Sequence, residues 1–158
     1  MKQTKTNAIR LLEQHKKPYT LFSYQVSDGK IDGQSVAQKI NKPEHVVYKT
    51  LVAQGKSGAI YVALIPVNEE LHLKKLQKVT AEKKVNMLLA KQLHDVTNYV
   101  RGGCSPIGMK KPYPTFIDSQ AAQLDTIVVN AGKVGLQMEL RLSDLVEAAN
   151  AQFAELTI

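Results

Sequence analysis

The sequence predicts one compact α/β domain of 158 residues, and three observations support this. A chain of this length corresponds to a single domain, since roughly 150 residues per domain is typical. Hydrophobic residues make up 44% and charged residues 22% of the chain, as in ordinary globular proteins. Two pairs of apolar segments flank short glycine-containing turns, and segments with helical spacing lie around them. We therefore expect one domain over residues 1–158 that combines helices with β-hairpins.

The first 43 residues predict a helix, a strand and a second helix. Thr6 has a side chain that caps helices, and apolar residues after it recur with helical spacing up to about His15. Pro18 cannot continue a helix, so the strand YTLFSY at 19–24 should follow it. The segment SVAQKI then indicates a short helix that ends before Pro43.

The middle of the chain predicts a hairpin, two helices and a glycine-rich loop. Strands at about 45–53 and 59–66 are joined by the turn G-K-S-G, which favours a hairpin. Helices are expected at about 69–79 and 87–95. The loop R-G-G-C-S-P-I-G follows at 101–108.

The C-terminal third predicts a second hairpin and a last helix. The strand PTFID is followed by a short helix that Asp118 or Ser119 is expected to cap. The segments TIVVNAG and GLQMEL form a hairpin around residues 132–135. Ser143 is expected to cap the helix SDLVEAANA, and QFAEL to add a final strand to the sheet.

Several classes of protein are excluded by composition. The longest apolar run, Ala59 to Val67, is about half the roughly 18 residues that cross a bilayer. The N-terminal segment MKQTKTNAIRLLEQHKK has no continuous apolar stretch, so we expect no secretory signal and a cytoplasmic location. A single cysteine, Cys104, cannot form an intramolecular disulfide, and four scattered histidines predict no metal and no cofactor.

The charge balance favours a polyanionic partner. Lysine and arginine number 21 against 14 acidic residues, a formal net charge of +7. Such a surplus promotes association with nucleic acid. The lysines are dispersed in pairs and few aromatic residues accompany them, so a merely solvated lysine surface is the alternative interpretation.

Lys49 is the first candidate site residue. In the strand HVVYKTLVA, alternation places Lys49 on one face with Val47, Leu51 and Ala53. Lysine is almost never buried without a partner, so this position indicates a carboxylate, a phosphate or a pocket. A lysine whose ammonium reaches solvent from an edge strand is the alternative.

The glycine loop is the second candidate. Gly102 and Gly103 allow positive φ and close approach of a ligand, and consecutive amides in such a loop can face an anion or a developing oxyanion. The loop matches neither a phosphate-binding loop nor a nucleophile elbow. Cys104 and Ser105 are possible nucleophiles, but no histidine nearby in the sequence is marked as their base.

The third candidate is the end of an apolar strand. Asn130 follows a continuously apolar stretch and stands two residues before Gly132, within the second hairpin. Strand ends beside glycine turns often carry binding sites, and equally often they are plain turns. The position therefore predicts either a site or a turn.

Four segments in this order resemble one known family. They are Y-K-T-L at 48–51, G-G-C-S-P-I-G at 102–108, PTFIDS at 114–119 and VNAGKVGLQMEL at 129–140. The chain is similar over nearly its whole length to the YbaK/EbsC family of aminoacyl-tRNA deacylases, which is related to the editing domain of bacterial prolyl-tRNA synthetases. The resemblance implies a mixed, largely antiparallel sheet that is curled into an incomplete barrel, with helices packed outside.

The resemblance also implies an activity and a set of residues. Family members remove cysteine from proline tRNA, acting beside prolyl-tRNA synthetase, and the substrate's own thiol attacks the ester. Lys49 would hold the terminal adenosine, Gly102 and Gly103 would supply oxyanion amides, and Tyr24 would line the pocket. Further substrate contacts are expected from Thr50, Ser105, Asn130 and Gly132. Asn130 replaces a serine of relatives, and Val134 an arginine, so neither a hydroxyl role at 130 nor a tRNA contact at 134 carries over.

Two other functions remain open from the sequence. A related domain could deacylate a tRNA that carries another small amino acid. The chain could instead bind tRNA or a synthetase without chemistry, as the net positive charge and the lack of an assembled nucleophile also suggest. Release of free amino acid from charged tRNA would separate these alternatives.

Overall fold

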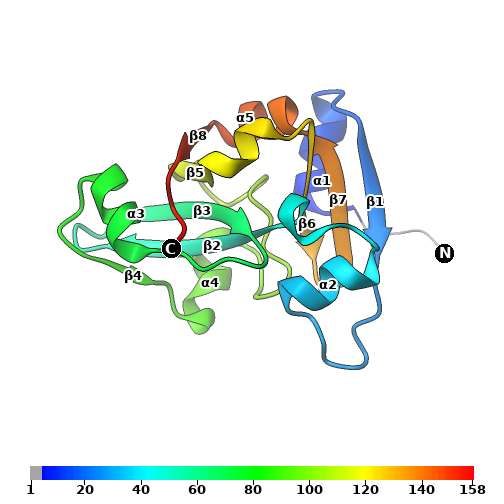
Figure 1. Ribbon diagram of the computed structural model, residues 1–158, viewed down its shortest axis with the longest axis horizontal. Helices are drawn as coiled ribbons and strands as arrows, with labels where there is room; N and C mark the ends of the chain where they lie inside the picture. The colour runs from blue at the N-terminus through cyan, green and yellow to red at the C-terminus, as the bar shows by residue number, and fades with distance from the viewer. Residues whose placement is uncertain (1–4) are drawn as a thin grey trace.

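The computed structural model describes residues 5–158. The strands form two sheets that meet near the middle of the molecule (Figure 1). One sheet is antiparallel, in the order β1 (Tyr19–Ser23), β7 (Leu136–Arg141), β6 (Thr126–Lys133). The other has the order β4 (Val85–Met87), β2 (Tyr48–Gly55), β3 (Ile60–Pro66), β5 (Thr115–Asp118), β8 (Ala151–Ala154). The pairs β4–β2 and β2–β3 are antiparallel, whereas β3–β5 and β5–β8 are parallel.

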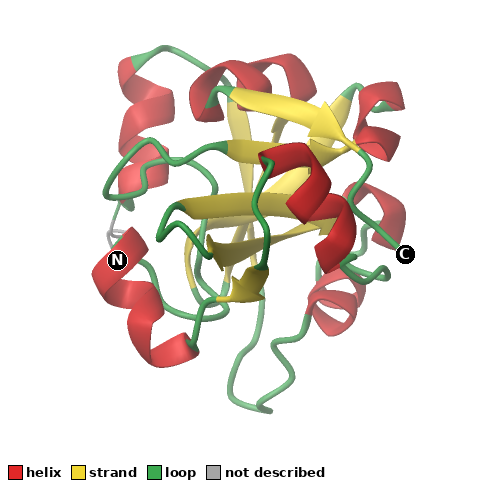
Figure 2. Cartoon of the chain, turned by 90° about the vertical axis from the view of Figure 1, so that its left-hand side faces the viewer, coloured by secondary structure: helices red, strands yellow, loops and turns green. Residues whose placement is uncertain are grey.

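The helices lie around these strands (Figure 2). They are α1 (Asn7–Gln14), α2 (Gly33–Lys39), α3 (Leu73–Thr80), α4 (Ala90–Thr97) and α5 (Leu142–Ala149), with short 3-10 helices at Glu44–Val46 and Ser119–Gln123. No helix among residues 5–158 is long and apolar enough to cross a membrane. The mixed α/β class and the largely antiparallel, unclosed sheets agree with the sequence prediction.

The two sheets join where β2 begins. Val47, just before β2, makes a parallel bridge with Val128 of β6. Both side chains are buried in an apolar cluster that also contains Tyr24 and Val36, which come from the end of β1 and from α2. Strands that are distant in sequence therefore converge at this junction, and the candidate site lies beside it.

Most local predictions are confirmed. Thr6 caps α1, since its hydroxyl accepts a hydrogen bond from the amide of Ile9. Both hairpins form, β2–β3 and β6–β7, and Gly135 has a φ of +95° in the turn of the second. Asp118 caps the short helix that follows β5.

Some boundaries were predicted wrongly. The strand expected from 45 begins at Tyr48, because residues 44–46 form a 3-10 helix. The helix expected from 69 begins at Leu73, and the one expected from about 87 begins at Ala90. Residues 85–87 instead form β4 at the edge of the second sheet. Ser143 is not the cap of α5: the helix starts one residue earlier, and the amide of Leu142 donates to the carbonyl of Asp125.

Candidate active site

A cleft of about 750 Å³ opens beside the junction of the two sheets. Its walls come from the start of β2, the segment between β1 and α2, the loop at 101–104, and one residue each of β6 and β7. The lining residues are Tyr24, Gly29, Ile31, Asp32, Gly33, Val36, Val47, Tyr48, Lys49, Thr50, Leu51, Val67, Arg101, Gly102, Cys104, Asn130 and Gln137. Five of the eight residues that the sequence proposed for the site therefore come together in one cleft.

Three buried polar atoms point to a ligand in this cleft. Within residues 5–158, the buried side-chain oxygens that have no hydrogen-bond partner are Tyr24 Oη, Thr50 Oγ1 and Gln137 Oε1. All three residues line the cleft. A buried polar group without a partner costs about 1–3 kcal/mol, so proteins rarely keep one without a reason. Three such residues in the wall of one cleft mark it as the candidate site for a polar ligand.

Lys49 brings a positive charge into the cleft. It lies on β2 opposite Ile65 and is partly buried. Five ion pairs form among the described residues, and Lys49 takes part in none of them. Lys49 therefore lies in the wall of a cleft, which is one of the alternatives that the sequence left open. Its uncompensated ammonium favours any anion or developing negative charge that enters the cleft.

Two more charged side chains line the cleft, and they have opposite signs. Arg101 is exposed at the glycine loop, and Asp32 caps α2 by accepting hydrogen bonds from the amide and hydroxyl of Ser35. These hydrogen bonds from Ser35 hold the pKa of Asp32 below its usual range, so the carboxylate stays ionised at neutral pH. With Lys49, the lining carries two cations and one anion and favours an anionic ligand.

Gly102 occupies a turn that a side chain would strain. Its φ is +82°, and the amide of Gly103 donates to the carbonyl of Val100 at 2.9 Å, which closes a four-residue turn. A Cβ at Gly102 would lie 3.2 Å from Cδ1 of Ile31. Positive φ and close packing both favour glycine here, as the sequence predicted.

Asn130 ties this turn to the β6–β7 hairpin. Its Nδ2 donates to the carbonyl of Gly102 at 2.7 Å, and its Oδ1 accepts from the amides of Gly132 and Lys133 at 2.7 and 3.2 Å. The side chain is buried, with 8% of its surface exposed. Asn130 therefore fixes the position of the glycine turn relative to the sheet.

Three residues proposed from the sequence do not line the cleft. The Gly103 amide is already bonded to Val100, and a Cβ at Gly103 would lie 2.8 Å from the backbone nitrogen of Val134, so this glycine serves close packing. Ser105 is fully buried, and its hydroxyl accepts from the amide of Ile107. Gly132 lines a separate hollow beside the start of α1. The expected oxyanion amide of Gly103 and the expected substrate contacts of Ser105 and Gly132 are therefore not supported.

Cys104 lines the cleft in a form that is unsuited to attack. It is 7% exposed, and burial raises the pKa of its thiol to about 12. The thiolate is the nucleophilic form of cysteine, so at neutral pH this group is almost entirely inert. Among residues 5–158 there is also no group of three or more histidine, cysteine or acidic residues that could hold a metal ion.

Gln137 is a site residue that sequence reasoning missed. It is directly opposite Asn130 in the β6–β7 ladder and 6% exposed. The sequence carries no signal for it, because alternation in GLQMEL places Gln137 and Glu139 together on the polar face of the strand. Only the pairing with β6 shows that Gln137 is buried and lines the cleft.

Comparisons with known proteins agree with the fold and the cleft. Residues 32–148 match the family model of the aminoacyl-tRNA editing domain. An Enterococcus faecalis protein named "Putative Cys-tRNA(Pro)/Cys-tRNA(Cys) deacylase EbsC" is 46% identical over 155 residues, which cover 98% of this chain and 94% of that protein.

Two solved structures show the same fold. The crystal structure of "a putative trans-editing enzyme for prolyl tRNA synthetase" has a TM-score of 0.84 at 19% identity and covers 99% of each chain. That of a hypothetical protein has a TM-score of 0.86 at 18% identity, over 96% of this chain and 99% of that one.

Fold and site together define an α/β domain of the aminoacyl-tRNA editing class. The family match spans most of the chain, and the identity to EbsC extends over nearly all of it. This chain belongs to the aminoacyl-tRNA editing domain family, within its YbaK/EbsC group.

Proposed function

We propose that the protein is a trans-acting deacylase that removes cysteine from mischarged Cys-tRNA(Pro), and also from Cys-tRNA(Cys). The polar wall of the cleft carries this proposal: Lys49 forms no ion pair among the described residues, and the three residues whose buried oxygens have no partner lie in the same wall. The name of the Enterococcus faecalis relative supports the choice of substrate.

A second selection step, after the synthetase has charged the tRNA, has a physical reason. Cysteine and proline are similar in size, and a synthetase pocket discriminates between such side chains by only about 1–3 kcal/mol. A separate hydrolytic site that accepts cysteine can supply the remaining discrimination. The partner of the protein is then the acceptor end of an aminoacylated tRNA, and its place of action is the cytoplasm beside prolyl-tRNA synthetase.

The substrate's own thiol performs the attack. Its sulfur forms a bond to the ester carbonyl carbon, the bond from that carbon to the ribose oxygen breaks, and the ribose oxygen takes up the thiol proton. Water then hydrolyses the resulting cyclic thioester to free cysteine. The protein contributes positioning and charge stabilisation, which account for large rate effects without a side-chain nucleophile.

The roles of the cleft residues follow from their chemistry. Lys49 holds the terminal adenosine through its phosphate or ribose and stabilises developing negative charge. The backbone of Gly102, fixed by Asn130, borders the reacting ester. Tyr24, Thr50 and Gln137 bind polar groups of the aminoacyl end. Cys104 stays protonated and is a spectator.

Variants that remove the unpartnered oxygens test the proposal, and Gln137→Leu removes the rest of its amide as well. Tyr24→Phe, Thr50→Val and Gln137→Leu remove groups that bond nothing in the protein, so each should leave the free energy of unfolding unchanged or raise it. The same variants should lower kcat/KM for Cys-tRNA(Pro) by about tenfold each, the value of one buried hydrogen bond. Lower stability together with full activity would show that these atoms serve the fold.

Substrate comparison tests the chemistry. Purified protein should release cysteine from tRNA(Pro) much faster than serine, because a thiol ionises more easily than an alcohol and is the better nucleophile. Lys49→Ala should fold and lose most of this activity. Equal rates for serine and cysteine would overturn the thiol mechanism. Binding of tRNA without release of any amino acid would favour the binding module.

A further inference from the structure

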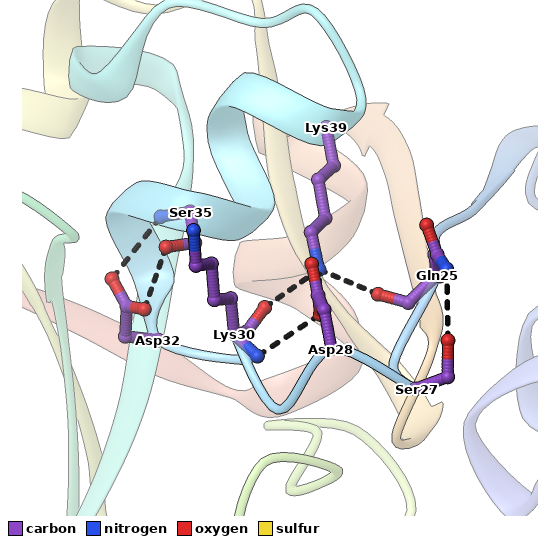
Figure 3. A network of polar contacts seen from close by, with 7 residues as sticks. All are labelled: Gln25, Ser27, Asp28, Lys30, Asp32, Ser35 and Lys39. Carbon is purple, nitrogen blue, oxygen red and sulfur yellow. Dashed lines mark hydrogen bonds and ion pairs between the residues drawn. The ribbon is translucent and has the colours of Figure 1, made fainter.

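We infer that Lys39 is a positioning residue that holds the segment Gln25–Asp32, here called the β1–α2 loop, as one wall of the cleft. The inference rests on the proposed function for its kinetic readout only. Its structural basis is a set of contacts that lies outside the catalytic residues discussed above. Figure 3 shows these contacts, with Lys39 reaching from α2 toward the loop.

The ammonium of Lys39 is bound on three sides by the loop. Its Nζ donates to the carbonyl of Gln25 at 2.6 Å, to the carbonyl of Lys30 at 2.8 Å and to Oδ1 of Asp28 at 2.8 Å. A lysine ammonium has three N–H donors, and here each has one acceptor. The side chain is 20% exposed, so these bonds are partly shielded from water.

Apart from Lys39, few polar bonds hold the loop in place. Most of its hydrogen bonds lie within the loop. The backbone amides of Gly29 and Ile31 donate to the carbonyls of Val26 and Gly29, and the backbone amide of Lys30 donates to the carboxylate of Asp28. Among the described residues, its polar bonds to the rest of the chain come from Lys39 and from Asp32. The Asp32 side chain caps α2, and the backbone carbonyl of Asp32 accepts from the amide of Val36 at 2.9 Å.

The loop forms a wall of the proposed active site. Gly29, Ile31 and Asp32 all line the cleft. The side chain of Ile31 packs against Gly102, since a Cβ on that glycine would lie 3.2 Å from Ile31 Cδ1. The loop thus contacts the same glycine turn that Asn130 bonds, and its position limits the width of the cleft.

Loss of the Lys39 ammonium should lower the fraction of molecules whose cleft is complete. The apparent affinity for a ligand falls in proportion to that fraction, whereas molecules that have bound correctly react at the normal rate. The effect should therefore appear in KM and in the dissociation constant, and much less in kcat. A residue that touches the reacting atoms would show the opposite division.

The test compares Lys39→Met with Lys42→Met in the full chain. Lys42 is a matched control: it follows α2, is 27% exposed, and pairs with Glu139 at 3.0 Å, but it does not line the cleft. Three quantities are measured for both variants: hydrogen exchange of the loop amides, binding of uncharged tRNA(Pro) by fluorescence anisotropy, and steady-state deacylation of Cys-tRNA(Pro). Lys39→Arg adds a variant that keeps the charge and changes its geometry.

Lys39→Met should speed exchange of the loop amides. If the loop is displaced in about 90% of the molecules, KM should rise about tenfold, while kcat stays within a factor of two of wild type. Lys39→Arg should fall between wild type and Lys39→Met, and Lys42→Met should match wild type. Loop exchange unchanged in Lys39→Met, or a KM equal to that of Lys42→Met, would overturn the inference. If wild type released no cysteine, the proposed function would fail, while loop exchange and tRNA binding would still decide the role of Lys39.

Discussion

Replacing Asn130 by alanine should loosen the cleft and destabilise the protein together. The side chain makes one bond as donor, to the carbonyl of Gly102, and two as acceptor, from the amides of Gly132 and Lys133. Asn130→Ala leaves all three backbone groups without that partner. Because the site is buried, water replaces the lost bonds poorly.

The magnitude follows from the number of bonds. At about 1 kcal/mol for each hydrogen bond, the free energy of unfolding should fall by about 3 kcal/mol. For a chain of this size, 1 kcal/mol corresponds to roughly 2–4 °C in Tm, so the expected shift is about 6–12 °C. The Gly102 turn loses its tether to β6, so kcat/KM for Cys-tRNA(Pro) should also fall.

Thermal melts followed by circular dichroism, with deacylation measured well below Tm, check both effects. Asn86→Ala is the control, since Asn86 is an exposed asparagine on the edge strand β4. Asn130→Asp keeps an acceptor for the two amides but turns a carboxylate oxygen toward the carbonyl of Gly102, so it should displace the glycine turn and lose activity as Asn130→Ala does. A Tm of Asn130→Ala equal to that of Asn86→Ala would refute the reasoning.

Two further predictions concern the glycine loop and its cysteine. Gly103→Ala should lower Tm more than Gly102→Ala. A Cβ at Gly103 would meet the backbone of Val134 at 2.8 Å, whereas at Gly102 the neighbour is the flexible end of Ile31, and the positive φ of Gly102 adds about 1–2 kcal/mol of strain. The reverse order in thermal melts would contradict the packing. Cys104 should resist alkylation by iodoacetamide at pH 8 until denaturant is added, and rapid labelling of the native protein would show that the thiol is accessible and ionised. The raised pKa of Cys104 also makes the free energy of unfolding depend on pH. The stabilisation from the buried, protonated thiol is complete below pH 9, the ordinary thiol pKa, and is lost as pH rises toward 12. Urea melts between pH 8 and 11 should therefore lose stability more steeply in wild type than in Cys104→Ala, and parallel curves would argue against burial as the cause.

Much of the fold was determined locally and could be predicted from the sequence. Thr6 begins α1 because its hydroxyl can bond a free amide at the helix start, whatever the helix later packs against. Gly135 marks the β6–β7 turn because few other residues adopt its φ. Lys49 stood out because a charge on an apolar face needs an explanation. Each of these features depends on neighbours within a few residues.

The tertiary structure decided which of these residues share a site. Nothing local to β3, β5 or β8 shows that they pair in parallel, or that Val47 joins the two sheets by bridging Val128, because these contacts link distant parts of the chain. The same limit applied to residues within one motif. Gly102 and Gly103 look alike in the sequence, yet one faces the cleft and the other gives its amide to Val100.

The site therefore had to be completed in three dimensions. Gln137 lines the cleft only because β7 pairs with β6. Ser105 lies outside the cleft, because it is fully buried and its hydroxyl accepts a hydrogen bond from the amide of Ile107. Lys39 reaches a loop that begins fourteen residues earlier in the chain, and its three acceptors converge only once that loop has folded back on α2. The sequence by itself determined residue chemistry and local geometry. Only long-range packing decided which polar groups lie in the cleft wall and which of them have no partner in the protein.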